Sequence, residues 1–125
     1  MTIKEAYEKL GGDYEELMHR VSESMLPLLI GMLLKDTNYE DLCAALERRD
    51  YEAAFRGAHT LKGVALNLSL MSLAEKASTL TEALRSRQDN AAIAPAFLEL
   101  KQVYLNIRTA FSKLLDSPSA GGDRQ

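Results

Sequence analysis

The sequence predicts an all-α protein: an antiparallel up-and-down four-helix bundle with extra short helices at its N-terminus. Two observations predict this class. Apolar residues recur at alternating spacings of three and four along three segments, and only short breaks separate those segments. Such spacing is typical of helices that pack about 20° from antiparallel, and short connections make consecutive helices antiparallel neighbours. No segment competes with the alternation expected of a β-strand.

The three segments are predicted to form helices at about 50–68, 70–86 and 91–116. Their apolar stripes are Tyr51, Ala54, Ala58, Leu61, Ala65 and Leu68; Leu70, Leu73, Ala77, Leu80 and Leu84; and Ile93, Phe97, Leu100, Tyr104, Ile107, Phe111 and Leu114. Residues suited to cap the N-termini of these helices are Asp50, Ser69 and Asn90.

The N-terminal half is predicted to supply the fourth bundle helix. Its apolar face consists of Leu26, Leu29, Ile30, Leu33 and Leu34, and continues in a shorter helix with Leu42, Ala45 and Leu46. Residues 35–38 separate the two parts. Ahead of them we expect short helices at about 3–9 and 13–22, with Gly11-Gly12 between them and Asp13 as a cap.

Length and composition predict one soluble domain. We place it at residues 1–116, followed by a disordered polar tail at 117–125. The net charge of −3, with no long basic run, argues against a nucleic-acid-binding surface. No apolar run approaches the roughly 20 residues of a membrane helix, and the N-terminus has no signal-peptide pattern. Cys43 is the one cysteine, so we expect no disulfide framework and a reducing cytoplasm.

The run Ala58-His59-Thr60-Leu61-Lys62-Gly63 carries the strongest chemical signal. A glycine inside a helix costs about 1 kcal/mol relative to alanine, so Gly63 makes little sense as helix design. It does leave bare backbone one turn after His59, on the same side of the helix. Lys62 adds a cation that could hold an anion. A nucleophilic imidazole, a positive charge and an open approach together suggest phosphoryl transfer through a phosphohistidine.

This run resembles the signature of histidine-containing phosphotransfer (HPt) domains, a helical His-x-Leu-Lys-Gly preceded by a small residue. Gly11-Gly12-Asp13 is similar to the N-terminal segment of that family. Residues 44–51 (AALERRDY) are similar to the element that leads into its phosphorylated helix. The resemblance covers roughly residues 3–115.

The resemblance implies a phosphoryl carrier of a bacterial-type two-component phosphorelay, phosphorylated on His59. Its donor and acceptor would be aspartates on response-regulator receiver domains, with a sensor or hybrid histidine kinase upstream. The chain would be a monomer without an ATP site, cofactor or metal of its own, and any Mg²⁺ would belong to the receiver. The sequence also lacks the glycine-rich phosphate loop and the sheet that an autonomous kinase would need.

A helical wheel places His59 roughly 120° from the core axis, at the solvent-exposed edge of its helix. Gly63 lies further out on that side, and Lys62 lies between them. The family implies that Lys62 neutralises phosphoryl charge and that Gly63 admits the partner protein. Family members often hold the histidine with a glutamine on the next helix; Thr81 aligns with it and is shorter. Where the family usually carries glycine between these helices, this chain has Ser69.

Apolar and polar residues near His59 are candidates for partner binding: Phe55, Leu66 and Asn67. For Phe55 and Leu66, burial in the core is an equal alternative. Exposed methionines of the N-terminal helices could extend the same docking surface.

A second class of function stays open, in which the bundle is a non-catalytic interaction scaffold and His59 is unused. Gly63 discriminates, because a scaffold has no reason to keep glycine there. His19, the other histidine, shares a charged helix face and is expected to be solvated. It lies too far from His59 in sequence to suggest a metal site.

Overall fold

The computed structural model describes residues 1–116, and within them the chain forms only helices and connecting turns. The predicted tail at 117–125 lies outside the described residues. None of the described helices is both long enough and apolar enough to cross a membrane. The elements are α1 (Ile3–Lys9), α2 (Tyr14–Met18), the 3-10 helix η1 (Glu23–Met25), α3 (Leu26–Lys35), α4 (Asn38–Glu47), α5 (Tyr51–Asn67), α6 (Met71–Ala83) and α7 (Ile93–Asp116).

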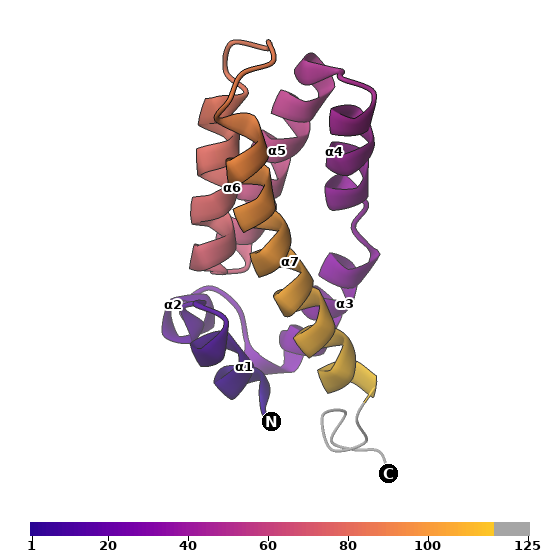
Figure 1. Cartoon of the computed structure of the whole chain (residues 1–125). Coiled ribbons are helices and arrows are strands. Elements are labelled where there is room, and N and C mark those ends of the chain that lie inside the picture. The colour runs from indigo at the N-terminus through magenta and orange to yellow at the C-terminus, as the bar shows by residue number, and fades with distance from the viewer. Residues whose placement is uncertain (117–125) are drawn as a thin grey trace.

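Helices α4, α5, α6 and α7 form the predicted antiparallel four-helix bundle (Figure 1). In it α5 packs against α4 and α6, and α6 packs against α7. Tyr39 of α4 closes the bundle by stacking on Tyr104 of α7, with ring centroids 4.0 Å apart. At about 1.5 Å per residue, the 24-residue α7 extends well beyond its bundle partners. Its far end packs against α1 and α3 (Figure 1).

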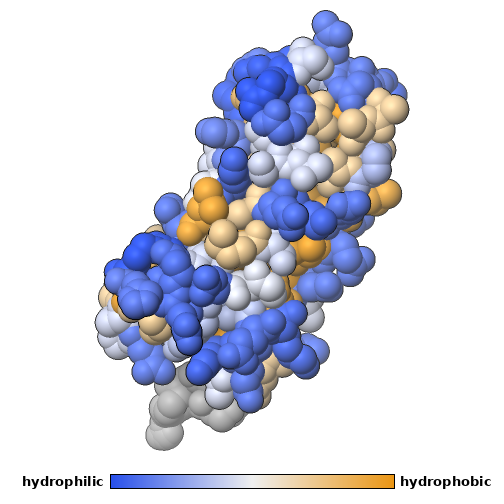
Figure 2. All heavy atoms as spheres, turned by 90° about the vertical axis from the view of Figure 1, so that its left-hand side faces the viewer, coloured by the Kyte–Doolittle hydropathy of each residue, from blue (hydrophilic) through white to orange (hydrophobic). Residues whose placement is uncertain are grey.

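The predicted apolar stripes form the core. Nearly all their members are buried, while Tyr51 and Phe97 are half-buried. The core is one cluster that runs from Ala6 in α1 to Leu114 in α7. On the outer surface of the molecule, the face that carries α6 is hydrophilic over most of its area, with small hydrophobic patches midway along it (Figure 2).

Three details of the N-terminal half differ from the expectation. The helix expected at 13–22 ends at Met18, and a turn and η1 follow it. The helix after residues 35–38 is not shorter than α3, because α3 and α4 each have 10 residues. The two expected parts also do not act as one bundle helix, because α3 packs beside the far end of α7 while α4 packs beside α5.

Among the caps, the prediction for Asp50 is confirmed, since its Oδ1 accepts a hydrogen bond from the Ala53 amide at 3.1 Å. The prediction for Ser69 is wrong. Leu70 precedes α6, and Ser69 has a left-handed backbone with φ 54°. Asn90 is also not the residue directly before its helix, because α7 begins at Ile93. Its Oδ1 accepts a hydrogen bond from the Ala92 amide at 2.9 Å and orders the turn before α7.

The N-terminal helices are tied to the turn between α5 and α6. The Tyr7 hydroxyl donates to the Leu68 carbonyl at 2.8 Å, and the Asp13 amide donates to the Ser69 carbonyl at 2.8 Å. A guanidinium nitrogen of Arg20 donates to the Ser69 hydroxyl at 2.7 Å. Because Tyr7 and Ser69 are fully buried, these bonds make α1 and α2 part of the same folded unit.

Candidate functional site

His59 lies near the middle of α5, with its side chain exposed to solvent. Gly63, one helical turn further on, is also exposed, and Lys62 is half-buried. This is the arrangement that the helical wheel predicts. The buried face of the same helix is formed by Ala54, Ala58, Leu61 and Ala65, so the core fixes the rotation of α5 that turns His59 outward.

No contact within the described residues requires a glycine at position 63. A Cβ atom added to Gly63 would meet no atom within 4 Å. Gly57, on the same helix, differs because its added Cβ would lie 3.5 Å from the Leu42 side chain of α4. A Cβ at position 57 would thus make an ordinary packing contact with α4, whereas Gly63 leaves open space beside His59.

Phe55 lies one turn before His59, and the two rings are nearly parallel. Their centroids are 6.4 Å apart with an interplanar angle of 6°. The guanidinium of Arg87 lies over the Phe55 ring at 3.7 Å from its centroid, and that of Arg85 lies at 5.7 Å. Phe55 is half-buried and packs against the core. Phe55 is therefore partly a core residue and partly a surface residue beside His59, so it combines the two predicted environments.

Three cations gather on this side of α5 and α6, and two of them are paired. Arg85 donates to Glu82 at 3.0 Å, and Arg87 donates to Glu52 at 3.2 Å. The hydrogen bond from Arg85 lowers the pKa of Glu82, and the charge of Lys62 contributes less to that shift. No carboxylate of the described residues forms a salt bridge with Lys62. Its charge is thus left available beside His59.

The structure gives no support to the orienting role predicted for Thr81. Its side chain is buried, and its hydroxyl donates to the Ala77 carbonyl at 2.7 Å in its own helix. Within residues 1–116 no hydrogen bond joins Thr81 to His59. Leu66 and Asn67, by contrast, are exposed one turn beyond Gly63, with 43% of the Leu66 surface accessible. Leu66 is therefore not the core residue of the alternative prediction.

The sequence model of the Hpt domain family matches residues 36–116 of this chain. The chain belongs to the Hpt family. Membership indicates a part in phosphoryl transfer in two-component systems, where Hpt domains generally act as phosphoryl carriers without an ATP site of their own. Searches of curated proteins and of solved structures give no significant match. The Hpt match begins just after α3, so α1, α2 and α3 lie outside it.

Two residues beside the candidate site, Arg85 and Arg87, are not predicted from the sequence. Both follow the last turn of α6, and no periodic pattern relates them to Phe55 on α5. The arginines reach Phe55 because α5 and α6 are antiparallel, so the end of α6 lies beside the first half of α5 (Figure 1).

An apolar groove of about 280 Å³ lies between α3 and α5, where it is lined by the half-buried Val64 and the exposed Asn67. Met32, with 60% of its surface accessible, lines its α3 side, and Asn67 lines its α5 side. The groove therefore joins an N-terminal helix to the surface around His59. This is the position in which we expected exposed methionines to extend a docking surface.

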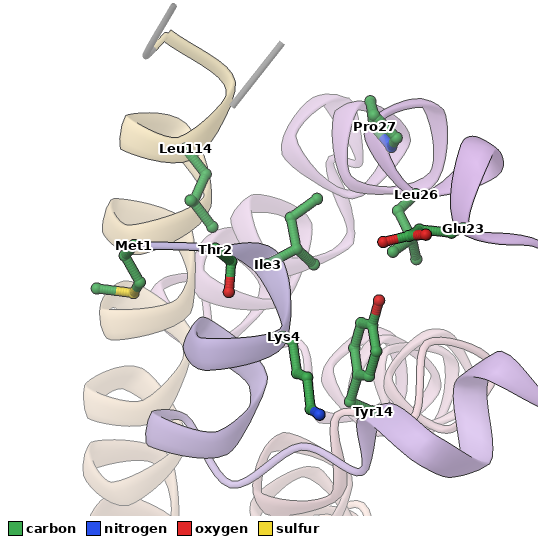
Figure 3. Close-up of a pocket in the computed structure, with 9 residues that line it drawn as sticks. All are labelled: Met1, Thr2, Ile3, Lys4, Tyr14, Glu23, Leu26, Pro27 and Leu114. Atoms are coloured by element: carbon green, nitrogen blue, oxygen red, sulfur yellow. The ribbon is translucent and has the colours of Figure 1, made fainter. Parts of the chain in front are cut away.

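Another cavity, of about 560 Å³, lies at the far end of the molecule between α1, α3 and α7 (Figure 3). None of its lining residues belongs to α5 or α6. In it the Tyr14 hydroxyl points toward Glu23 (Figure 3); burial raises the pKa of Tyr14, and the charge of Glu23 adds to the shift. Residues 1–116 contain no group of three or more histidine, cysteine, aspartate or glutamate side chains that could hold a metal ion.

Proposed function

We propose that this chain is a histidine phosphotransfer protein of a two-component phosphorelay, and that His59 carries the phosphoryl group between receiver-domain aspartates. An imidazole nitrogen of His59 attacks the phosphorus of an aspartyl phosphate. A P–N bond forms, the aspartyl O–P bond breaks, and the carboxylate leaves with the bonding electron pair. The phosphoramidate is energy-rich, so the reverse reaction with a second receiver aspartate passes the group on.

The observation that carries this proposal is the empty space beside an exposed histidine. His59 is accessible, and no contact in the described chain accounts for Gly63. A glycine that costs helix stability without an internal reason is accounted for by an external partner that approaches the backbone closely. Lys62 then supplies positive charge to the phosphoryl oxygens as they arrive.

The partner surface in this proposal surrounds His59. Phe55, Leu66 and Asn67 contribute to it from α5, and the groove beside Met32 extends it onto α3. The receivers supply the Mg²⁺ from their own acidic pockets, a sensor or hybrid histidine kinase supplies the phosphoryl group to the relay, and the chain acts as a cytoplasmic monomer.

Incubation with a phosphorylated receiver domain and Mg²⁺, followed by location of the label, tests the proposal. The chain has two histidines, so His19→Gln is a matched control for His59→Gln. We expect acid-labile, base-stable label on the wild type and on His19→Gln, and none on His59→Gln. The His59→Gln variant should keep the wild-type melting temperature, because its side chain is exposed.

Two outcomes would contradict the proposal. Label on His59→Gln would place the phosphoryl group elsewhere, and the absence of label from every receiver tested would favour the scaffold alternative. ATP and Mg²⁺ without another protein should give no label, since in-line transfer from ATP needs a nucleotide site. Stoichiometric labelling from ATP alone would indicate a kinase instead.

A further inference from the structure

The ring of Phe55 lies beside the imidazole of His59. The two side chains are four residues apart on one helix face and lie parallel within 6°. Their centroid distance of 6.4 Å is within the range of aromatic pairs in proteins. A parallel neighbour on one side disfavours rotation of the imidazole out of its plane, and among residues 1–116 no side-chain hydrogen bond engages either ring nitrogen.

Phe55 is itself held by Arg87. The guanidinium lies 3.7 Å from the Phe55 centroid, well inside the distance of a cation–π contact. Its Nη1 donates to the Arg85 carbonyl at 2.7 Å, and its Nε donates to Glu52 at 3.2 Å. Arg87 also has a left-handed backbone, with φ 56°, which is unfavourable for a side chain other than glycine. Three contacts thus accompany a strained backbone and fix the guanidinium over the ring.

The direction of the imidazole plane matters for phosphoryl transfer. The lone pair of an imidazole nitrogen lies in the ring plane, so an attacked phosphorus must also lie close to that plane. The buried Thr81, whose hydroxyl donates to Ala77, leaves this orientation to other groups. We propose that Phe55, clamped by Arg87, is the positioning residue for His59. This inference rests on the proposed function, in which His59 is the phosphorylated residue.

Phosphorylation by phosphoramidate separates positioning from docking, because this donor is a small molecule and needs no receiver. The His59 nitrogen attacks phosphorus, a new P–N bond forms, and the P–N bond to the donor nitrogen breaks with release of ammonia. The variants are Phe55→Leu, which keeps apolar packing without a ring, and Phe55→Tyr, which keeps the ring. Arg87→Gln removes the cation over the ring. Arg56→Gln is its matched control, since Arg56 also bonds to Glu52, at 2.7 Å, but lies over no ring.

We expect Phe55→Leu to slow labelling by phosphoramidate roughly fivefold, the size of a modest aromatic contact converted to a rate. Labelling by a receiver should slow by at least the same factor. With phosphoramidate as donor, Phe55→Tyr and Arg56→Gln should be labelled at the wild-type rate, and Arg87→Gln at an intermediate rate. NMR of the folded proteins should show that the His59 ring protons lose their ring-current shift in Phe55→Leu and keep it in Phe55→Tyr.

The remaining outcomes separate this inference from the proposed function. Equal phosphoramidate rates for wild type and Phe55→Leu would overturn the positioning role; if receiver transfer alone slowed, Phe55 would be a docking residue. Restoration of the rate by any apolar residue would likewise assign Phe55 to packing. A wild type labelled by phosphoramidate and by no receiver would contradict the proposed function and leave the positioning result standing. A wild type labelled by neither donor would contradict both.

Discussion

At the scale of single residues, the exposed side of α5 carries a residue that is a poor helix former. Gly63 weakens the helix at a position where an added Cβ would contact nothing in the described chain. Lys62 places a cation beside an exposed imidazole without a salt-bridge partner among the described carboxylates. A glycine that weakens its helix and a cation without a salt bridge both favour an interaction outside the chain.

Gly63→Ala should raise the free energy of unfolding by up to about 1 kcal/mol, because alanine is the better helix former. Gly63→Gln should slow transfer from a receiver, because its longer side chain occupies the approach to His59. Gly57→Ala is the matched control: its Cβ makes an ordinary contact with Leu42, so it should gain similar stability without loss of transfer. Equal transfer rates for Ala, Val and Gln at position 63 would remove the steric argument.

Lys62→Ala should slow phosphoryl transfer without abolishing it, because lysine offers charge and no covalent bond. The half-exposed charge is partly screened, so the defect should shrink as salt rises. Denaturation should show a larger stability loss in the phosphorylated form, where Lys62 has an anion to hold. Lys113→Ala, on the last turn of α7, provides a control for loss of a surface cation. Equal losses in both phosphorylation states would make Lys62 a structural residue.

At the scale of elements, the turn between α5 and α6 shows how a non-glycine residue is kept in a left-handed conformation. Ser69 has φ 54°, a geometry that glycine adopts without steric cost. The hydroxyl of Ser69 donates to Glu16 and accepts from Arg20 of the α2 region. These two bonds account for a serine where the resemblance leads one to expect glycine.

Urea denaturation of two variants separates the backbone and hydroxyl contributions at Ser69. Ser69→Ala loses the hydrogen bonds and keeps the strained φ, so it should be less stable than Ser69→Gly by about 1 kcal/mol. Both should be less stable than the wild type, because the bonds of Glu16 and Arg20 to the hydroxyl are lost. Arg49, in the exposed turn before α5, also has a positive φ, of 59°. Arg49→Ala should therefore be less stable than Arg49→Gly by the same amount, although Arg49 has no hydroxyl. A Ser69→Ala variant as stable as Ser69→Gly would refute the backbone argument.

At the scale of the whole molecule, the folded unit is larger than the part that the family model matches. The match begins at residue 36, yet the core includes buried side chains from α1, α2 and α3. These helices cover the far end of α7, where Phe111 and Leu114 are buried. The bundle that presents His59 therefore shares its core with a segment that precedes the family match.

Deletion of residues 1–35 should abolish cooperative unfolding. It removes five large buried side chains: Tyr7, Leu17, Leu26, Ile30 and Leu33. At about 1.5–3 kcal/mol each, their loss rivals the whole stability of a typical domain. Circular dichroism during heating would measure this. Tyr7→Phe, which removes only the bond to Leu68, should lower stability by about 1–2 kcal/mol and keep the cooperative transition. A deletion variant that melts within a few degrees of the full chain would show that the family match is the complete folding unit.

The sequence by itself determined the helices, the core stripes and the exposure of His59. These features follow from the period of the α-helix, which is local: once Ala54, Ala58, Leu61 and Ala65 are buried, the side on which His59 lies is fixed. The Asp50 cap is equally local, because its partner is three residues away.

The tertiary structure alone decided which residues of the turns and helix ends meet across the bundle. Ser69 bonds to Glu16, which lies 53 residues away, and Arg87 bonds to Glu52 at a separation of 35 residues while covering Phe55. The hydroxyl of Thr81 also went to its own helix instead of to a neighbour. Such pairings depend on how packed helices bring distant parts of the chain together, and helical periodicity carries no information about that.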